Sequence, residues 1–168
     1  MGNGLTEVRD SFQHYQVFGY TADQIVAQMA ACSPVAPWGG EASYAISTRF
    51  TYASSGGSCS TTSVKVGLHT TAIVPTWSNT PQAEAGLAAR WNTYSAALMT
   101  HEQGHVDIAE QYASKTLSDL QAIHSAATCS ALSSQLTTKA NADIAALSQA
   151  EVDYDNQTQH GITQGAVL

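Results

Sequence analysis

The feature that most constrains the fold is a long series of apolar residues at helical spacing in the middle of the chain. From Leu87 to Tyr112, apolar side chains recur every three or four residues. This spacing places them on one face of an α-helix, and the pattern continues to about residue 123, so we predict a helical region that opens at Pro81. Unbroken, about 40 residues of helix would be roughly 60 Å long. We therefore expect a bend or a break in it.

This series contains an H-E-x-x-H pattern, His101-Glu102-Gln103-Gly104-His105. Histidines four residues apart lie one helical turn apart on one face, so both can reach one metal ion. His101 and His105 continue the apolar series, which predicts that both point inward, where a shared zinc ion would satisfy their ring nitrogens. Glu102 matches the general base of metalloproteases. The alternative is a pair of core histidines hydrogen-bonded to neighbours. A glycine inside a helix, here Gly104, destabilises the helix by roughly 1 kcal/mol relative to alanine. Its presence therefore indicates that another group packs tightly against this position.

A catalytic zinc ion takes three protein ligands and keeps one position for water, so a third ligand is needed. The polar, turn-rich C-terminal stretch offers His160, directly before a glycine, as the first choice. The alternatives are three carboxylates of the same region: Glu151, Asp153 and Asp155. A further polar group should stabilise the oxyanion of the reaction. We predict Tyr154 as this catalytic residue, with His124 as the alternative.

The remaining patterns predict an α+β fold. Residues 42–52 alternate between apolar and polar side chains, and residues 64–75 form a second strand, so the two should pair as an antiparallel hairpin. Residues 12–18 would add a third strand to this small antiparallel sheet. Thr21 and Gln24 form a capping box for a short helix to about Ala31, with Ile25, Val26 and Met29 buried. A C-terminal helix should run from Leu132 to about Val152. We expect one domain over residues 1–168, with a flexible leader at residues 1–10.

Composition excludes several classes of partner. The net charge is −7, with six lysines and arginines in total and no basic run, so nucleic acids and anionic membrane surfaces are not expected partners. No apolar run reaches the roughly 18 residues of a spanning helix, so membrane insertion is not expected. The N-terminus lacks the features of a signal peptide, which leaves a cytosolic protein or an exported one whose signal has been removed. We expect a monomer.

The three cysteines allow at most one internal disulfide. None forms a C-x-x-C pair, so a cysteine zinc site is not expected. In an exported protein one bridge is plausible, and a bridge that closes about 70 residues would contribute roughly 4 kcal/mol. Three reduced thiols are the alternative.

Several short motifs recur in order along nearly the whole chain. They are His14-Tyr15-x-Val17-x-Gly19-x-Thr21-Ala22, Cys59…Val64-x-Val66, Pro75-x-Trp77, Trp91…His101-Glu102-x-Gly104-His105, Cys129, and Tyr154-Asp155-x-x-Thr158-x-His160-Gly161-x-x-Gln164-Gly165-Ala166. In these residues the sequence resembles a bacterial family of uncharacterised domains described as predicted secreted zinc-dependent proteases.

The resemblance implies a zincin-like metallopeptidase domain, secreted or periplasmic, with His101 and His105 as ligands and Glu102 as general base. It favours Cys59–Cys129 as the disulfide. Cys32 then remains as the odd thiol, at a place where the family more usually has Gly before Pro.

The predicted function is therefore a secreted zinc metalloprotease that acts on a peptide or protein substrate. Two alternatives stay open. One is a secreted zinc-binding or interaction module with a structural or degenerate site. The other is a zinc amidase that acts on a non-peptide bond, such as a cell-wall amide.

Overall fold

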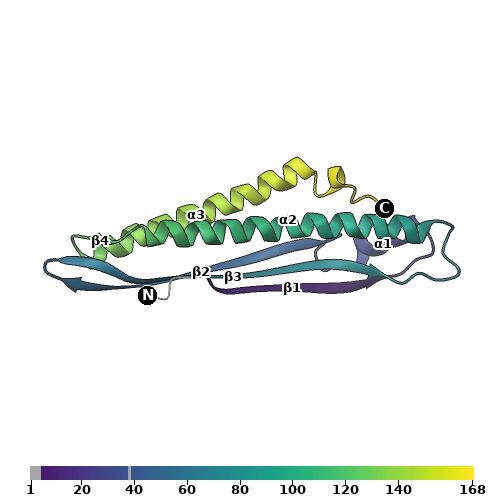
Figure 1. The fold of residues 1–168 in the computed structure, drawn as a ribbon. Coiled ribbons are helices and arrows are strands. Elements are labelled where there is room, and N and C mark those ends of the chain that lie inside the picture. Colours follow the sequence, from purple (N-terminus) through teal and green to yellow (C-terminus); the bar gives the residue numbers. More distant parts are fainter. Residues whose placement is uncertain (1–4, 38) are drawn as a thin grey trace. The chain divides into compact units, whose positions relative to one another are not determined.

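The structure is a computed structural model that describes residues 5–37 and 39–168, without the side chains of residues 6–10. Its elements, in chain order, are β1 (Leu5–Val17), α1 (Ala22–Cys32), β2 (Glu41–Ser55), β3 (Ser58–Trp77), α2 (Leu87–Gln121), β4 (Ser125–Ala126), α3 (Cys129–Thr158) and the 3-10 helix η1 (Ile162–Gln164) (Figure 1). The chain folds into two compact units. Among the described residues, unit 1 holds residues 5–9, 44–70 and 107–152, and unit 2 holds residues 10–37, 39–43, 71–106 and 153–168.

The predicted α+β class is confirmed, with a four-stranded sheet in the order β1-β3-β2 and the short β4 paired to β3. β2 and β3 form the expected hairpin. Its two turn residues are Gly56 and Gly57, with φ of 61° and 83°, the left-handed backbone that two-residue hairpin turns require.

The sheet is mixed, so the prediction of an antiparallel sheet is wrong for β1. The hydroxyls of Ser11 and Thr71 lie 3.0 Å apart, and Thr76 Oγ1 donates to the carbonyl of Tyr15 at 3.2 Å. Residue numbers therefore rise in the same direction along both strands, which makes β1 and β3 parallel. β1 also begins at Leu5, so residues 5–10 belong to a strand and not to a leader. The rest of the expected leader, residues 1–4, lies outside the described residues.

The first helix follows its sequence signals closely. Thr21 caps α1 by accepting from Gln24 N–H at 3.3 Å, and Gln24 Oε1 accepts from Tyr20 N–H at 2.7 Å. Ile25 and Met29 are buried as predicted, whereas Val26 is 45% exposed, so its predicted burial is wrong.

The two long helices differ from the prediction at their ends. α2 begins at Leu87, because residues 81–86 form turns and Gly86 has a φ of 78°. It is one continuous helix of 35 residues, and the expected break is absent from it. α3 runs from Cys129 to Thr158, so it includes Tyr154 and Asp155, which we expected in an irregular tail.

Each unit has its own apolar core. In unit 1, buried residues of β3, α2 and α3 pack together, among them Val66, Leu120 and Leu136. The predicted disulfide Cys59–Cys129 is present in this unit, and Cys32 is a free, exposed thiol. In unit 2, α1 packs beside the first half of α2 and the end of β3, burying Ile25, Trp91 and Leu98 among others (Figure 1).

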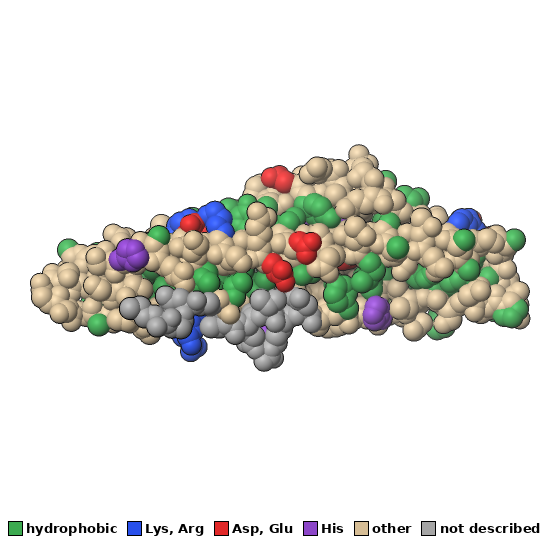
Figure 2. Space-filling view, in the orientation of Figure 1, with side chains coloured by type: hydrophobic (Ala, Val, Ile, Leu, Met, Phe, Trp, Pro, Cys, Tyr) green, Lys and Arg blue, Asp and Glu red, His purple; other side chains and the backbone are tan. Residues whose placement is uncertain are grey.

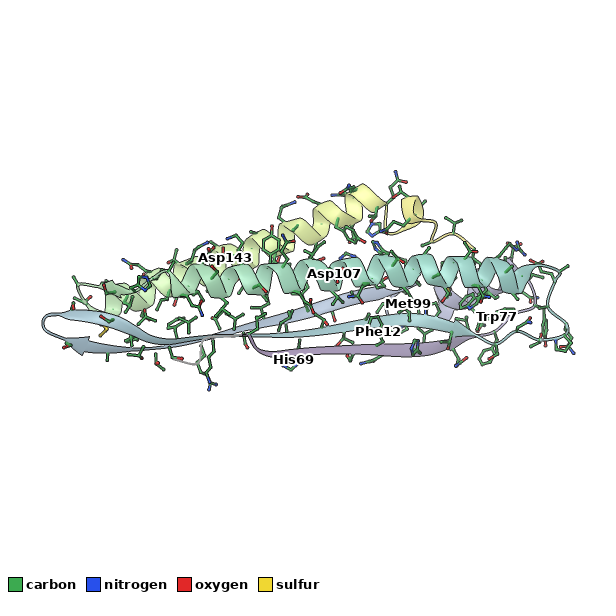
Figure 3. The ribbon with its side chains drawn as sticks, viewed as in Figure 1. Phe12, His69, Trp77, Met99, Asp107 and Asp143 are labelled. Atoms are coloured by element: carbon green, nitrogen blue, oxygen red, sulfur yellow. A yellow bond between two sulfur atoms is a disulfide. The ribbon has the colours of Figure 1, made fainter. Side chains whose placement is uncertain are left out.

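The surface agrees with the sparse charge of the sequence. Charged residues make up 11% of the chain, and few charged side chains interrupt the face drawn in Figure 2. His69 of β3 is exposed (Figure 3). Among the described residues, no helix is long and apolar enough to cross a membrane. The prediction of one domain over residues 1–168 stays a prediction.

Candidate metal site

The two histidines of the H-E-x-x-H pattern both point into unit 2, as predicted. Their side chains are only 4% (His101) and 12% (His105) exposed. Their Nε2 atoms lie 3.3 Å apart, and their rings meet edge to face with centroids 4.8 Å apart. The helical spacing of four residues therefore aims both nitrogens at one point.

Asp155 of α3 reaches the same point. Its Oδ1 atom lies 3.3 Å from His101 Nε2 and 3.2 Å from His105 Nε2. Three ligand atoms about 3.3 Å apart match the edge of a tetrahedron around zinc, whose bonds to nitrogen and oxygen are about 2.0–2.1 Å. Asp155 Oδ1 is buried, yet it accepts no hydrogen bond from the described residues. Three ligand atoms that converge at these distances, one of them a carboxylate oxygen without a hydrogen bond, fit a metal ion, so His101, His105 and Asp155 form a possible metal site.

His160 lies next to this group at the surface. It follows the end of α3 in the left-handed conformation, with a φ of 53°. Its Nδ1 atom is 3.2 Å from Asp155 Oδ1, and its side chain is 42% exposed. The third member of the buried group is therefore Asp155, one of the three carboxylates predicted as alternatives to His160. The group contains neither Glu151 nor Asp153. His160 as a ligand stays a prediction.

The far side of the His101 ring is held by the C-terminal segment. Gln164 Oε1 lies 3.0 Å from His101 Nδ1, and an amide oxygen can only accept, so Nδ1 carries the proton and Nε2 faces Asp155 with its lone pair. Thr158 Oγ1 is a second, longer neighbour of Nδ1, at 3.4 Å. Burial, and then the nearby His105, lower the pKa of His101. A neutral ring with a fixed tautomer is the form that binds a metal.

Tyr154 is the residue that packs against Gly104 of α2. Its ring stacks on that of His101, with centroids 5.2 Å apart, and its hydroxyl donates to the His101 carbonyl at 3.3 Å. A Cβ atom on Gly104 would lie 2.0 Å from this hydroxyl, so the tight packing predicted at Gly104 is confirmed. Gln164 Nε2 donates to the same hydroxyl at 3.0 Å. These contacts make Tyr154 part of the wall that holds His101, and its role as an oxyanion donor stays a prediction.

Glu102 is buried between the helix and the start of β2. It is 2% exposed, and desolvation, its largest influence, raises its pKa to about 7 against the opposing effects of His105 and a hydrogen bond from the Ala42 backbone. A Cβ atom on Gly40 would lie 2.8 Å from Glu102 Oε1, so only glycine leaves room for the carboxylate there. Glu102 Oε2 is buried and has no hydrogen-bond partner among the described residues. A carboxylate with a pKa near neutrality and a free oxygen can exchange a proton at neutral pH.

Sequence reasoning missed the roles of Gln164, Thr158 and Gly40. The helical spacing of Tyr154, Asp155 and Thr158 places them on one face of α3, and a longer predicted helix would have grouped them. Gly161, with a φ of 84°, packs against the ring, since a Cβ there would lie 3.2 Å from His101 Cγ. No local pattern identifies Gln164 or Gly40, because their partners are distant in sequence.

Comparison with known proteins gives a family but no characterised relative. Residues 12–161 match the model of a family described as "Bacterial protein of unknown function (DUF922)". No curated protein matches the chain. No solved structure matches it either.

Proposed function

The chain belongs to the bacterial family of unknown function DUF922, and we propose that it is a secreted zinc-dependent metalloprotease. The observation that carries the proposal is the convergence of His101 Nε2, His105 Nε2 and Asp155 Oδ1 at 3.2–3.3 Å from one another beside the buried Glu102. Two histidines and a carboxylate are a ligand set of catalytic zinc. The zincin-like assignment rests on the same H-E-x-x-H helix.

The chemistry follows from the ligand set and from the groups that surround it. Bound zinc would supply a Lewis acid, which polarises a substrate carbonyl and acidifies water. Glu102, whose pKa is raised to about 7, accepts a proton from the attacking water and passes it to the leaving amine. Gln164 and Tyr154 hold His101 in the tautomer that presents Nε2. The substrate is a peptide or protein.

The disulfide supports the proposed location. Disulfides persist in oxidising compartments and are rare in the cytosol, and Cys59–Cys129 is present. Secretion, or release into a periplasm, agrees with this bond.

A second candidate is a structural zinc site in a binding module. His160 Nδ1 lies 3.2 Å from Asp155 Oδ1, which makes His160 the candidate for a fourth ligand, although it lies outside the group whose three ligand atoms converge. Four protein ligands would close the site, whereas an enzyme keeps one position open. This candidate predicts zinc binding without hydrolysis.

Metal content tests the site first. We expect about one zinc per chain in the purified protein, measured by mass spectrometry of the metal, and its loss in His101→Ala and Asp155→Ala. His14→Ala, an exposed histidine of β1 in the same unit, is the control and should retain zinc. Retention in His160→Ala would support an open, three-ligand site. Zinc absent from the unmutated protein, even after dialysis against zinc, would overturn the proposal.

Hydrolysis then separates the enzyme from the module. The zinc-loaded protein is incubated with casein and, separately, with peptidoglycan fragments, and Glu102→Gln serves as the blank because it keeps the side-chain size but cannot accept the proton. Cleavage of casein above the blank supports the protease. Cleavage of peptidoglycan alone indicates an amidase, and cleavage of neither favours the closed structural site.

A further inference from the structure

Unit 2 contains a pocket of about 600 Å³ that shares no residue with the buried metal group. This volume lies within the roughly 300–1,000 Å³ of small-molecule sites. One wall comes from α1, where Gln24, Ala27, Gln28 and Ala31 line the pocket. Their spacing of three and four residues places them on one helix face, so two amide side chains alternate with two small alanines.

The rest of the wall is rich in aromatic rings. Phe18, Tyr20 and Trp77 line the pocket, and Figure 3 shows Trp77 at the end of β3, beside the start of α2. Trp77 Nε1 donates to the Gly19 carbonyl at 3.0 Å, which holds the indole in place. Phe18 is 67% exposed and Tyr20 51%. Large aromatic side chains left exposed around a pocket are typical of a binding site.

The polar groups of the pocket are neutral. Of the described residues that line it, none is charged. Gln24 Oε1 accepts from the Tyr20 N–H at 2.7 Å, so this amide is positioned in advance. The hydroxyl oxygen of Thr80, another lining residue, is buried and has no hydrogen-bond partner in the part of the chain that the structure describes. An unsatisfied buried hydroxyl is unfavourable, so Thr80 favours a ligand that brings a hydrogen-bonding group to this part of the wall.

These features restrict the class of ligand. A charged ligand would lose its hydration and find no counter-charge in the described wall. A wholly apolar ligand would bury the glutamine amides and the hydroxyls without partners. A neutral sugar meets both demands, because its C–H face packs on an aromatic ring while its hydroxyls donate and accept at the rim. We propose that this pocket binds a short neutral carbohydrate, stacked on the aromatic wall and hydrogen-bonded to the α1 amides.

This inference goes beyond the proposed function and does not depend on it. The two sites have no residue in common, so a chain without zinc should still bind the sugar. The sugar site would hold the protein on a glycan while the metal site acts on its own substrate.

Binding is tested with three neutral tetrasaccharides, chitotetraose, cellotetraose and maltotetraose, titrated separately into the full chain. The readouts are the side-chain amide resonances of Gln24 and Gln28 and the indole resonance of Trp77. We expect saturable shifts with at least one sugar, and affinity weakened about tenfold in Tyr20→Ala and in Gln28→Ala. Tyr52→Ala is the matched control, because Tyr52 is an exposed tyrosine (39%) of β2 outside the pocket.

Three results would overturn the inference. They are the absence of shifts with all three sugars, shifts that persist unchanged in both pocket variants, and saturation of the same resonances only by an uncharged apolar peptide such as acetyl-Leu-Phe-amide. His101→Ala separates the two proposals. It should bind the sugar as the unmutated chain does, whatever its zinc content.

Discussion

At the scale of single residues, the site depends on one glycine. Alanine at an exposed helix interior usually stabilises a protein by about 0.5–1 kcal/mol relative to glycine. At Gly104 the added Cβ would meet the Tyr154 hydroxyl at 2.0 Å, which forces the Tyr154 ring away from His101. Gly104→Ala should therefore destabilise the folded protein, although alanine is usually the more stabilising residue in a helix.

We predict that Gly104→Ala lowers the free energy of unfolding by about 1–3 kcal/mol, measured by urea denaturation. The same substitution in a Tyr154→Ala background should be neutral or stabilising, because the clash is gone and helix propensity remains. Stabilisation by Gly104→Ala in the unmutated background would show that Tyr154 does not occupy this position.

A second residue-scale prediction concerns Gln164, which acts through His101. Gln164→Leu removes the acceptor that lies 3.0 Å from His101 Nδ1, so the ring loses its fixed tautomer and orientation. We expect zinc affinity to fall about 10–100-fold, measured by competition with a coloured chelator. Gln157→Leu, an exposed glutamine of α3, is the control. Equal affinities in both variants would exclude the positioning role.

At the scale of elements, two lysines and two aspartates join α2 to α3 within unit 1. Lys139 Nζ lies 2.6 Å from Asp143 Oδ1, and Lys115 Nζ lies 3.1 Å from the same atom. Both lysines also pair with Asp119. Asp143 is nearly buried, with a side chain 4% exposed, so its charge requires these partners.

This cluster predicts a pH dependence of stability. Hydrogen bonds from Lys115 and Lys139 lower the pKa of Asp119 to about 2. A pKa below the unfolded value of about 3.9 means that the ionised carboxylate stabilises the folded state. This contribution is full above pH about 4 and is lost as the pH falls toward 2. Because Lys115 and Lys139 lie at the surface, solvent screens their attraction to Asp119, and the contribution to the free energy of unfolding should be small.

The measurement is urea denaturation between pH 5 and 2, with Asp119→Asn compared with the unmutated chain. The variant should show a shallower loss of stability over this range. Glu110→Gln, at another carboxylate of the same helix, is the control and should keep the original slope. High salt should shrink the difference, and identical slopes for Asp119→Asn and the unmutated chain would contradict the assignment.

At the scale of the whole molecule, the Cys59–Cys129 bond should dominate stability. It links residues 70 apart in sequence, and closing a loop of this length is worth about 4 kcal/mol in the chain-entropy model. We predict that the double substitution Cys59→Ala with Cys129→Ala lowers the free energy of unfolding by about 3–4 kcal/mol. Urea denaturation without reductant measures the change.

The control is Cys32→Ala, which removes the free exposed thiol. It should change the free energy of unfolding by less than about 0.5 kcal/mol. A loss below about 1 kcal/mol in the double variant would contradict the entropic account.

The sequence by itself determined the features that depend on neighbouring residues. Alternation and helical spacing specify β2, β3, α1 and most of α2, because backbone geometry repeats every two or 3.6 residues. The inward aim of His101 and His105 follows from the same periodicity. The position of Gly104 inside a helix also predicted a tight contact, but it did not identify Tyr154 as the partner.

Only the tertiary structure decided which distant groups meet these residues. Tyr154 lies 53 positions from His101 and Gln164 lies 63, and no local pattern encodes such pairs. Asp155 joins the metal group because α3 continues past its predicted end, and Gly40 becomes necessary because Glu102 fills its Cβ position. The parallel direction of β1 likewise depends on its pairing with β3. Such contacts come from the packing of segments that are far apart in sequence, and they therefore appear only once the chain has folded.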